Sequence, residues 1–163
     1  MKDNNLEIRR FQKADTDAVI DLHKKALPKA TFDRISEGTF DDFDDIESIY
    51  IKPGGDFVVG TINDVIVAMG GLKKVSDTLG EIKRMRVEPL LQRHGFGQAI
   101  LNRLEERARE LGFDCLELET GAEADQEPAQ RLYEKNGYKE YKREDVDGIP
   151  CIFYRKTLKT TNS

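Results

Sequence analysis

Hydrophobic and polar positions follow two different periods along the chain, and each period predicts a kind of element. Runs that alternate, or that are short and apolar, are typical of strands. Such runs occupy Leu6–Arg10, Phe57–Val59, Val65–Leu72, Glu81–Val87, Cys115–Glu119, Tyr138–Lys142 and Ile149–Thr157. The pair Asn63-Asp64 between the second and third runs is a hairpin signal, so we expect these two strands to be adjacent and antiparallel.

Apolar residues spaced three and four apart predict helices elsewhere. The first begins at a cap, Asp15 or Thr16, and stops at Pro28. The second runs over Gly97–Leu111 with Gly112 as its stop, and the third begins at Pro128 and ends at Asn136-Gly137. Between Thr31 and Ser48 the pattern weakens, which indicates a short helix and loop.

The order of elements, β-α-(α)-β-β-β-α-β-α-β-β, predicts an α/β fold with a mixed sheet and helices packed on its faces. The 163 residues suit one domain, which we expect over residues 1–158 with a polar tail at 159–163. No internal repeat is present.

Composition narrows the possible partners. No apolar run approaches the ~18 residues that a membrane span requires, and the polar start of the chain lacks a signal peptide, so we expect a cytoplasmic protein with no membrane partner. The net charge of −5 and the pI near 5.2 disfavour nucleic acid. A cationic small molecule is easier to accommodate.

Metal chemistry has no support in the sequence. Cys115 and Cys151 lie apart without metal-ligand spacing, and we expect both to be small buried residues. His23 and His94 are isolated histidines. The acidic run Asp41 to Glu47 has two interpretations, a surface that attracts an ammonium substrate or a solvated helix end.

The segment Gln92-Arg93-His94-Gly95-Phe96-Gly97 lies between a strand that ends at Val87 and a helix. Unpaired N–H groups and the positive end of the helix would converge there on an anion, although a plain turn has the same composition. The dinucleotide fingerprint fails because its third glycine position holds Ile100, and no Walker sequence is present.

The pattern that fits is Gln/Arg-x-x-Gly-x-Gly/Ala. It resembles the acetyl-CoA pyrophosphate loop of the GNAT N-acetyltransferase superfamily. The segment "PAQRLYEKNGYKE" (Pro128 to Glu140) is similar to a second motif of that family, Ala-x-x-Leu-Tyr-x-x-x-Gly-Phe/Tyr. The resemblance extends from about Leu6 to Leu158 and is strongest between Glu81 and Tyr138.

This resemblance implies a GNAT fold: a central, mixed, largely antiparallel twisted sheet of about six to seven strands flanked by about four helices. It also implies direct transfer of an acetyl group from acetyl-CoA, as co-substrate, to a primary amine of a small molecule or peptide. The implied cofactor contacts are Met85, Val87, Gln92, Arg93, His94, Gly95, Phe96, Gly97 and Gln126. Gln126 stands where relatives often carry asparagine, and Val87 would contact pantetheine through its backbone amide.

Acetyl transfer needs an acid for the leaving thiolate and a base for the ammonium. The resemblance places the acid at Tyr133, whose alternative interpretation is a core tyrosine on the apolar stripe of the last helix. It places the base at Glu81, whose alternative is a solvated carboxylate opposed to Lys83 or Arg84. Glu117 and Glu119 are weaker candidates for the base, and water chains can also serve.

A β-bulge near the site would break the parity by which Glu81, Lys83, Met85 and Val87 share one strand face. Arg84 and Arg86 would bind phosphates or pair with acids. The alternative function is a non-catalytic acyl-CoA-binding sensor, and a homodimer is possible under either function.

Overall fold

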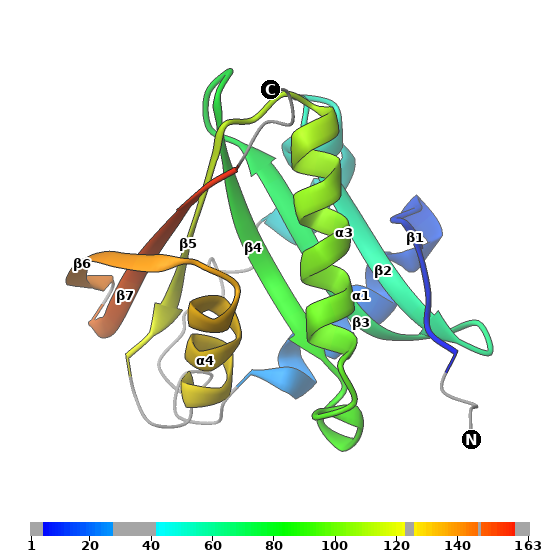
Figure 1. Cartoon of the computed structure of the whole chain (residues 1–163). Helices are drawn as coiled ribbons and strands as arrows, with labels where there is room; N and C mark the ends of the chain where they lie inside the picture. The colour runs from blue at the N-terminus through cyan, green and yellow to red at the C-terminus, as the bar shows by residue number, and fades with distance from the viewer. Residues whose placement is uncertain (1–4, 28–41, 123–125, 147, 159–163) are drawn as a thin grey trace.

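The computed structural model describes residues 5–27, 42–122, 126–146 and 148–158. Its centre is one seven-stranded sheet in the order β1-β2-β3-β4-β5-β7-β6 (Figure 1). The strands are β1 Glu7–Arg10, β2 Asp56–Ile62, β3 Val65–Lys74, β4 Leu79–Val87, β5 Cys115–Gly121, β6 Lys139–Val146 and β7 Ile149–Thr157. Only β4 and β5 are parallel, and every other neighbouring pair is antiparallel. The expected mixed, largely antiparallel sheet is confirmed.

The β2–β3 hairpin turns at the predicted pair. Asn63 and Asp64 have φ of 50° and 68°, the left-handed values that a two-residue turn of type I′ requires and that asparagine and aspartate tolerate. Both strands extend beyond the predicted bounds, because Asp56, Thr61 and Lys74 also join the ladder.

Helices cover both faces of the sheet. They are α1 Thr16–Ala26, α3 Phe96–Glu110 and α4 Glu127–Lys135, with short turns η1 Lys13–Asp15, η3 Glu47–Ile51 and η4 Pro89–Leu91. In Figure 1, α3 and α4 lie in front of the sheet and α1 lies behind it. The expected stop at Pro28 and most of the Thr31–Ser48 segment lie outside the described residues.

Two hydrophobic cores follow from this layering. The larger core packs Ile100, Leu101 and Leu104 of α3 against the front of the sheet and includes Tyr133 of α4. The smaller core lies behind the sheet, where Val19 and Leu22 of α1 pack with residues such as Phe43, Tyr50, Phe57 and Met69. The sheet is therefore buried on both faces at its centre.

Two details differ from expectation. The carboxylate of Asp15 does not cap α1, since it accepts hydrogen bonds from both Arg9 Nη1 and Nη2 at 2.8 and 3.0 Å and so ties η1 to β1. Cys151 is buried as expected, whereas Cys115 is partly exposed. Asp15 is drawn to Arg9 because η1 lies beside β1. Cys115 is partly exposed because it is the first residue of β5, at the rim of the sheet.

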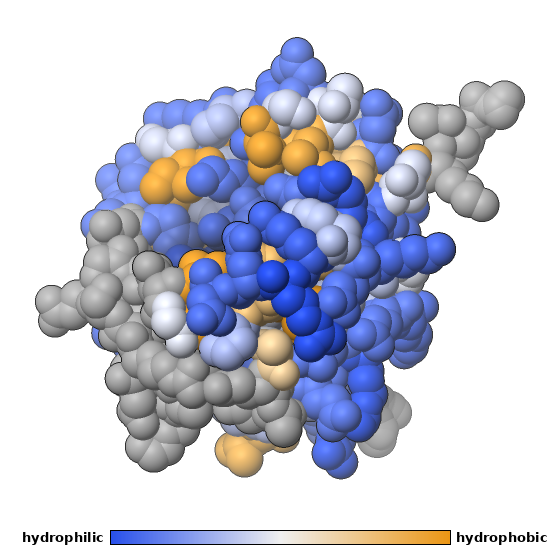
Figure 2. All heavy atoms as spheres, turned by 90° about the vertical axis from the view of Figure 1, so that its left-hand side faces the viewer, coloured by the Kyte–Doolittle hydropathy of each residue, from blue (hydrophilic) through white to orange (hydrophobic). Residues whose placement is uncertain are grey.

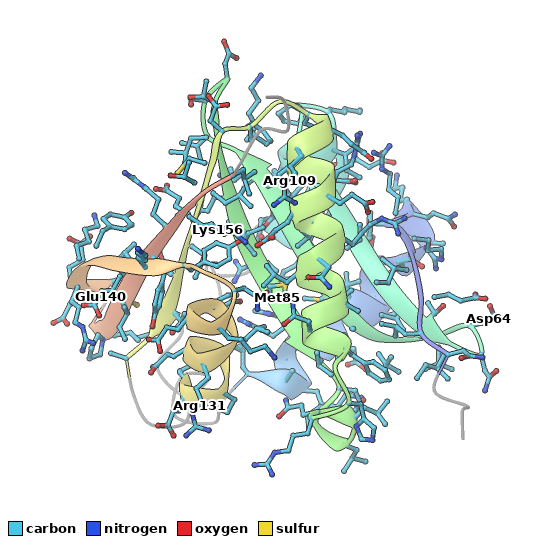
Figure 3. The ribbon with its side chains drawn as sticks, in the orientation of Figure 1. Asp64, Met85, Arg109, Arg131, Glu140 and Lys156 are labelled. Atoms are coloured by element: carbon cyan, nitrogen blue, oxygen red, sulfur yellow. The ribbon has the colours of Figure 1, made fainter. Side chains whose placement is uncertain are left out.

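A buried ion network joins α3 to the far arm of the sheet. Glu105 accepts hydrogen bonds from Tyr138 Oη at 2.7 Å and from Lys156 Nζ at 3.0 and 3.1 Å. Arg109 lies 3.9 Å from the same carboxylate, and Figure 3 shows Lys156 and Arg109 on facing sides of this junction. The network fixes β7 relative to α3 and so orients the arm that carries α4.

The outer arm formed by β5, β7 and β6 ends in a strand exposed along most of its length. Figure 2 views the molecule from this side and shows a largely hydrophilic surface with small hydrophobic islands. Within the described residues, no helix has the length and apolar character needed to cross a membrane.

Candidate active site

Strand β4 contains the bulge that the sequence could not locate. Met69 of β3 pairs with Arg86, and Gly71 pairs with Lys83, so two residues of β4 oppose one residue of β3. Arg84 sits in this bulge with φ of 58°. A bulge adds a residue to one strand and re-aims the side chains that follow.

The bulge divides the side chains of β4 between the two faces of the sheet. Ile82, Met85 and Val87 pack into the core beneath α3, with Met85 drawn between β4 and α3 in Figure 3. Arg84 points to the opposite face, where it binds Asp42. Glu81 and Lys83 also lie on that rear face, so the expected break in parity is confirmed.

The same strand separates from β5 just before the bulge. The parallel ladder pairs Leu79 to Glu81 with Cys115 to Glu117 and stops there. Beyond these residues β4 and β5 diverge, with α4 in front of the opening and the 88–95 connection at its lower end (Figure 1). Each strand therefore presents an edge with backbone groups that the neighbouring strand does not use, which suits an extended ligand.

The connection from β4 to α3 leaves its backbone donors free. Arg93 and Gly95 have φ of 71° and 83°, and Gly95 is the N-cap of α3 without a side-chain cap. Within this fully described segment, no backbone N–H from Gln92 to Gln98 donates to a protein acceptor. Successive free N–H groups at the positive end of a fifteen-residue helix are donors of the kind that bind anions.

The side chains of this loop mostly support the backbone. Gln92 Nε2 donates to the carbonyl of Val87 at 3.4 Å. His94 Nδ1 lies 3.0 Å from the carbonyl of Leu91, and the His94 ring stacks on Phe96 at 5.8 Å between centroids. The Phe96 side chain is buried in the core, so only its backbone is available to a cofactor.

Of two other expected cofactor residues, the side chain of Met85 lies in the core and that of Gln126 lies at the end of β5. The side chain of Met85 belongs to the core, while its carbonyl accepts a hydrogen bond from Arg86 Nη1 at 2.7 Å. Gln126 is the N-cap residue of α4 and its side chain packs on Gly121 at the end of β5. It therefore stands at the rim of the opening between the strands.

Tyr133 lies in α4 and is 6% exposed. Its ring packs edge-on against Tyr138 at 5.8 Å, yet its hydroxyl makes no hydrogen bond to any described residue. Burial raises the Tyr133 pKa to about 12, and the positive charge of Arg86 opposes that rise. The ring of Tyr133 is thus part of the core. Its hydroxyl is protonated at neutral pH and donates no hydrogen bond to any described residue.

The carboxylates proposed as bases lie behind the opening. Glu117 accepts hydrogen bonds from Arg155 Nη2 at 2.9 Å and from Tyr141 Oη at 3.3 Å. Glu81 forms no ion pair with the described residues, so the expected pairing with Lys83 or Arg84 is not found. Although the Glu119 residue is exposed overall, desolvation of its carboxyl group and the charge of Glu81 raise the Glu119 pKa.

The acidic run contributes one structural carboxylate. Asp42 accepts hydrogen bonds from Arg84 Nη2 at 2.8 Å and Nε at 2.9 Å and from Tyr50 Oη at 2.6 Å. Burial raises the Asp42 pKa, but the hydrogen bond and charge of Arg84, together with the hydrogen bond from Tyr50 and the charge of Lys83, outweigh it and leave the pKa lowered. Asp42 is therefore neither a free ammonium site nor a solvated helix end, while Asp41 lies outside the described residues.

Arg86 and His23 form a contact that the sequence did not predict. Arg86 Nε donates to His23 Nδ1 at 3.2 Å, and no described carboxylate forms an ion pair with Arg86, so the expected pairing with an acid is wrong for this residue. Burial lowers the His23 pKa to about 2. The two residues are 63 positions apart, and no local pattern signals their contact.

Comparison with known proteins gives three curated relatives, of which two illustrate the match. The chain is 39% identical over 75 residues to the uncharacterized N-acetyltransferase YsnE of Bacillus subtilis, covering 46% of this chain and 50% of that protein. It is 34% identical over 88 residues to the IAA acetyltransferase of Azospirillum brasilense, covering 53% and 56%. The chain thus spans about half the length of these relatives.

Solved structures share the fold. An acetyltransferase of the GNAT family from Staphylococcus aureus has a TM-score of 0.84 at 23% identity, over 95% of this chain and 100% of that chain. A GNAT acetyltransferase from Elizabethkingia anophelis with acetyl-CoA bound has a TM-score of 0.71 at 19% identity, over 95% and 99%. The profile described as "Acetyltransferase (GNAT) family" matches residues 16–138, and the chain therefore belongs to the GNAT acetyltransferase family.

Proposed function

We propose that this protein is an acetyl-CoA-dependent N-acetyltransferase that moves an acetyl group directly to a primary amine. The observation that carries the proposal is the run of free backbone N–H groups from Gln92 to Gln98, placed beside the opening between β4 and β5. A pyrophosphate held by these groups would direct the pantetheine arm along the free edge of β4. The thioester would then lie between the strands, near Tyr133.

The residues suit the parts of acetyl-CoA in that placement. The free amides of the loop and the exposed Arg93 match the negative charge of a pyrophosphate. The edge of β4 near Val87 offers backbone groups to the amides of pantetheine, as in strand addition. Gln126, at the rim beside Gly121, offers a side-chain amide to the same arm.

The reaction requires two proton transfers. The amine nitrogen attacks the thioester carbonyl carbon, and the C–S bond breaks as the amide forms. The departing thiolate takes a hydrogen bond, and finally a proton, from the Tyr133 hydroxyl. Burial favours the protonated phenol at neutral pH, and the nearby charge of Arg86 stabilises negative charge developing at this position.

The ammonium form of the acceptor must first lose a proton. We assign this step to Glu81 with Glu119 beside it, since both carboxylates lie on the rear face near the strand opening. Burial, and then the charge of Glu81, raise the Glu119 pKa and make it a stronger base than an ordinary carboxylate. Glu117 is a poorer candidate for the base because it already forms an ion pair with Arg155.

The direct test is the release of free thiol from acetyl-CoA across a panel of primary amines. We expect release that depends on the amine and that falls strongly in Tyr133→Phe. The non-catalytic sensor is not favoured, because curated relatives carry acetyltransferase names and Tyr133 keeps an unused hydroxyl. Binding of CoA without release on any amine would revive the sensor and contradict our proposal.

A further inference from the structure

Arg86 has more hydrogen-bond donors than the protein uses. A guanidinium carries five N–H donors. In Arg86, Nε donates to His23 Nδ1 and Nη1 donates to the Met85 carbonyl, and no other acceptor in the described chain receives a bond from it. The rest of the planar fork of this half-buried side chain, including all of Nη2, has no hydrogen-bond partner among the described residues.

Among the residues that the structure describes, no ion pair neutralises the charge of Arg86. The charge of Asp42 acts on Arg86, but that carboxylate already accepts two hydrogen bonds from Arg84 and a third from Tyr50. Burial, and then the like charge of Arg84, lower the Arg86 pKa to about 10. A half-buried cation without an ion-pair partner among the described residues is costly to keep, which is the situation that an anionic ligand relieves.

The Arg86 side chain lies on the face of the sheet that we assign to the acceptor, and not on the face that we assign to the cofactor. The cofactor edge of β4 and the free loop amides lie with Met85 and Val87 toward α3. Arg86 faces α1, on the rear side with Glu81 and Glu119. Its charge opposes the rise that burial causes in the Tyr133 pKa, so the guanidinium is within electrostatic range of the place where bonds would change.

Resting on the proposed function, we propose that Arg86 binds the carboxylate of the acceptor, and that the acceptor is therefore a small amino acid-like molecule carrying both an amine and a carboxylate. The free fork of a guanidinium matches a carboxylate through two parallel hydrogen bonds. The amine of the same molecule would then face the thioester, with Glu81 and Glu119 available for its proton. Such an acceptor is a zwitterion, which suits a site with the positive charge of Arg86 and the carboxylates of Glu81 and Glu119.

The test uses product analogues, so that it does not depend on turnover. N-acetylalanine and N-acetylphenylalanine, each beside its carboxamide, are titrated by calorimetry into the protein saturated with CoA. We expect at least one acid to bind about 10- to 100-fold more tightly than its amide, and Arg86→Gln to remove that preference. Equal affinity of acid and amide, no detectable binding of either acid, or an unchanged preference in Arg86→Gln would overturn the inference.

Matched variants separate this role from a structural one. Arg86→Lys keeps the charge but not the fork and is expected to retain part of the preference, whereas Arg103→Gln removes an exposed arginine of α3 and is expected to change nothing. CoA affinity reports folding in each variant. Amine-dependent thiol release without any preference for carboxylates would leave the proposed function standing and refute the Arg86 site; carboxylate binding without release would do the reverse.

Discussion

Tyr133 combines a buried ring with a hydroxyl that the fold does not use. Its ring fills the core between α4 and the sheet, and phenylalanine would fill the same volume. We therefore expect Tyr133→Phe to leave the CoA dissociation constant within about twofold of wild type and to lower the rate of acetyl transfer about 100-fold. Stopped assays of thiol release and calorimetry measure the two quantities separately. An unchanged rate would remove Tyr133 from the role of acid.

His23 gives the stability a pH dependence whose sign is set by burial. The folded state holds the neutral imidazole, with its pKa lowered from 6.5 to about 2, while the unfolded state takes up a proton below pH 6.5. The stabilisation is complete above that pH and is lost as the pH falls. We expect the free energy of unfolding to fall by about 1.4 kcal/mol per pH unit between pH 6 and 5.

The comparison that isolates this effect is His23→Leu. Denaturant unfolding across the same pH interval should show a shallower slope in the variant, whatever its absolute stability. The lowered pKa values of Asp15 and Asp42 act in a lower window, since their stabilisation is lost only below the unfolded pKa of 3.8. Parallel slopes for wild type and variant between pH 6 and 5 would contradict the assignment.

At the scale of elements, strand β4 shows what sequence patterning can and cannot predict. The alternation from Glu81 to Val87 predicted a strand at nearly its observed bounds. It could not show where the extra residue of the bulge lies, because Lys83, Arg84 and Arg86 are chemically alike and the pattern is compatible with either face. The pairing of Arg84 with Asp42 depends on a contact across 42 positions, which no local period encodes.

The N-terminus of α3 provides a test of the proposed phosphate site. A methyl group at Gly97 would meet only Leu132 Cδ2 at 3.6 Å and Val87 Cγ2 at 3.8 Å, which are ordinary contacts. Gly97→Ala should therefore leave the melting temperature unchanged or raise it, since alanine is the better helix former. It should also weaken CoA binding about tenfold or more, because the methyl group would hold phosphate away from the backbone.

Gly95→Ala, in contrast to Gly97→Ala, should destabilise the protein. No atom lies within 4 Å of a methyl group at Gly95, but its φ of 83° is strained for alanine. We expect a loss of about 1–2 kcal/mol in stability from backbone strain alone. CoA binding by Gly97→Ala as tight as that of wild type would contradict the placement of the pyrophosphate at this helix end.

The junction of α3 with β7 predicts a large cost in stability. Glu105→Ala would leave the buried Tyr138 Oη and the partly buried Lys156 Nζ without their acceptor, and we expect a loss of about 3 kcal/mol in the free energy of unfolding. Glu106→Ala, an exposed neighbour on the same helix, should change it by less than about 0.5 kcal/mol. Equal effects in urea unfolding of the two variants would show that the network does not stabilise the junction.

For the whole molecule, the sequence predicted the order of strands and helices and the family, but not how the site is assembled. The loop motif and the helix signals around Gly95 and Pro128 are local, so they could be read from the chain. The opening between β4 and β5 depends on where a parallel ladder stops, and the uncompensated charge of Arg86 depends on Asp42 being used elsewhere. Both are properties of the folded molecule, and together they are the basis of the proposed acceptor side.

The central claim is transfer of an acetyl group from acetyl-CoA to an amine. The most direct measurement uses acetyl-CoA with an isotopically labelled acetyl group, a pool of primary amines and amino acids, and mass spectrometry of both the pool and the intact protein. We expect a labelled N-acetyl product, no labelled acyl-protein intermediate, and strong loss of product in Tyr133→Phe. Binding of CoA with no labelled amine in the pool, or accumulation of labelled protein, would contradict it.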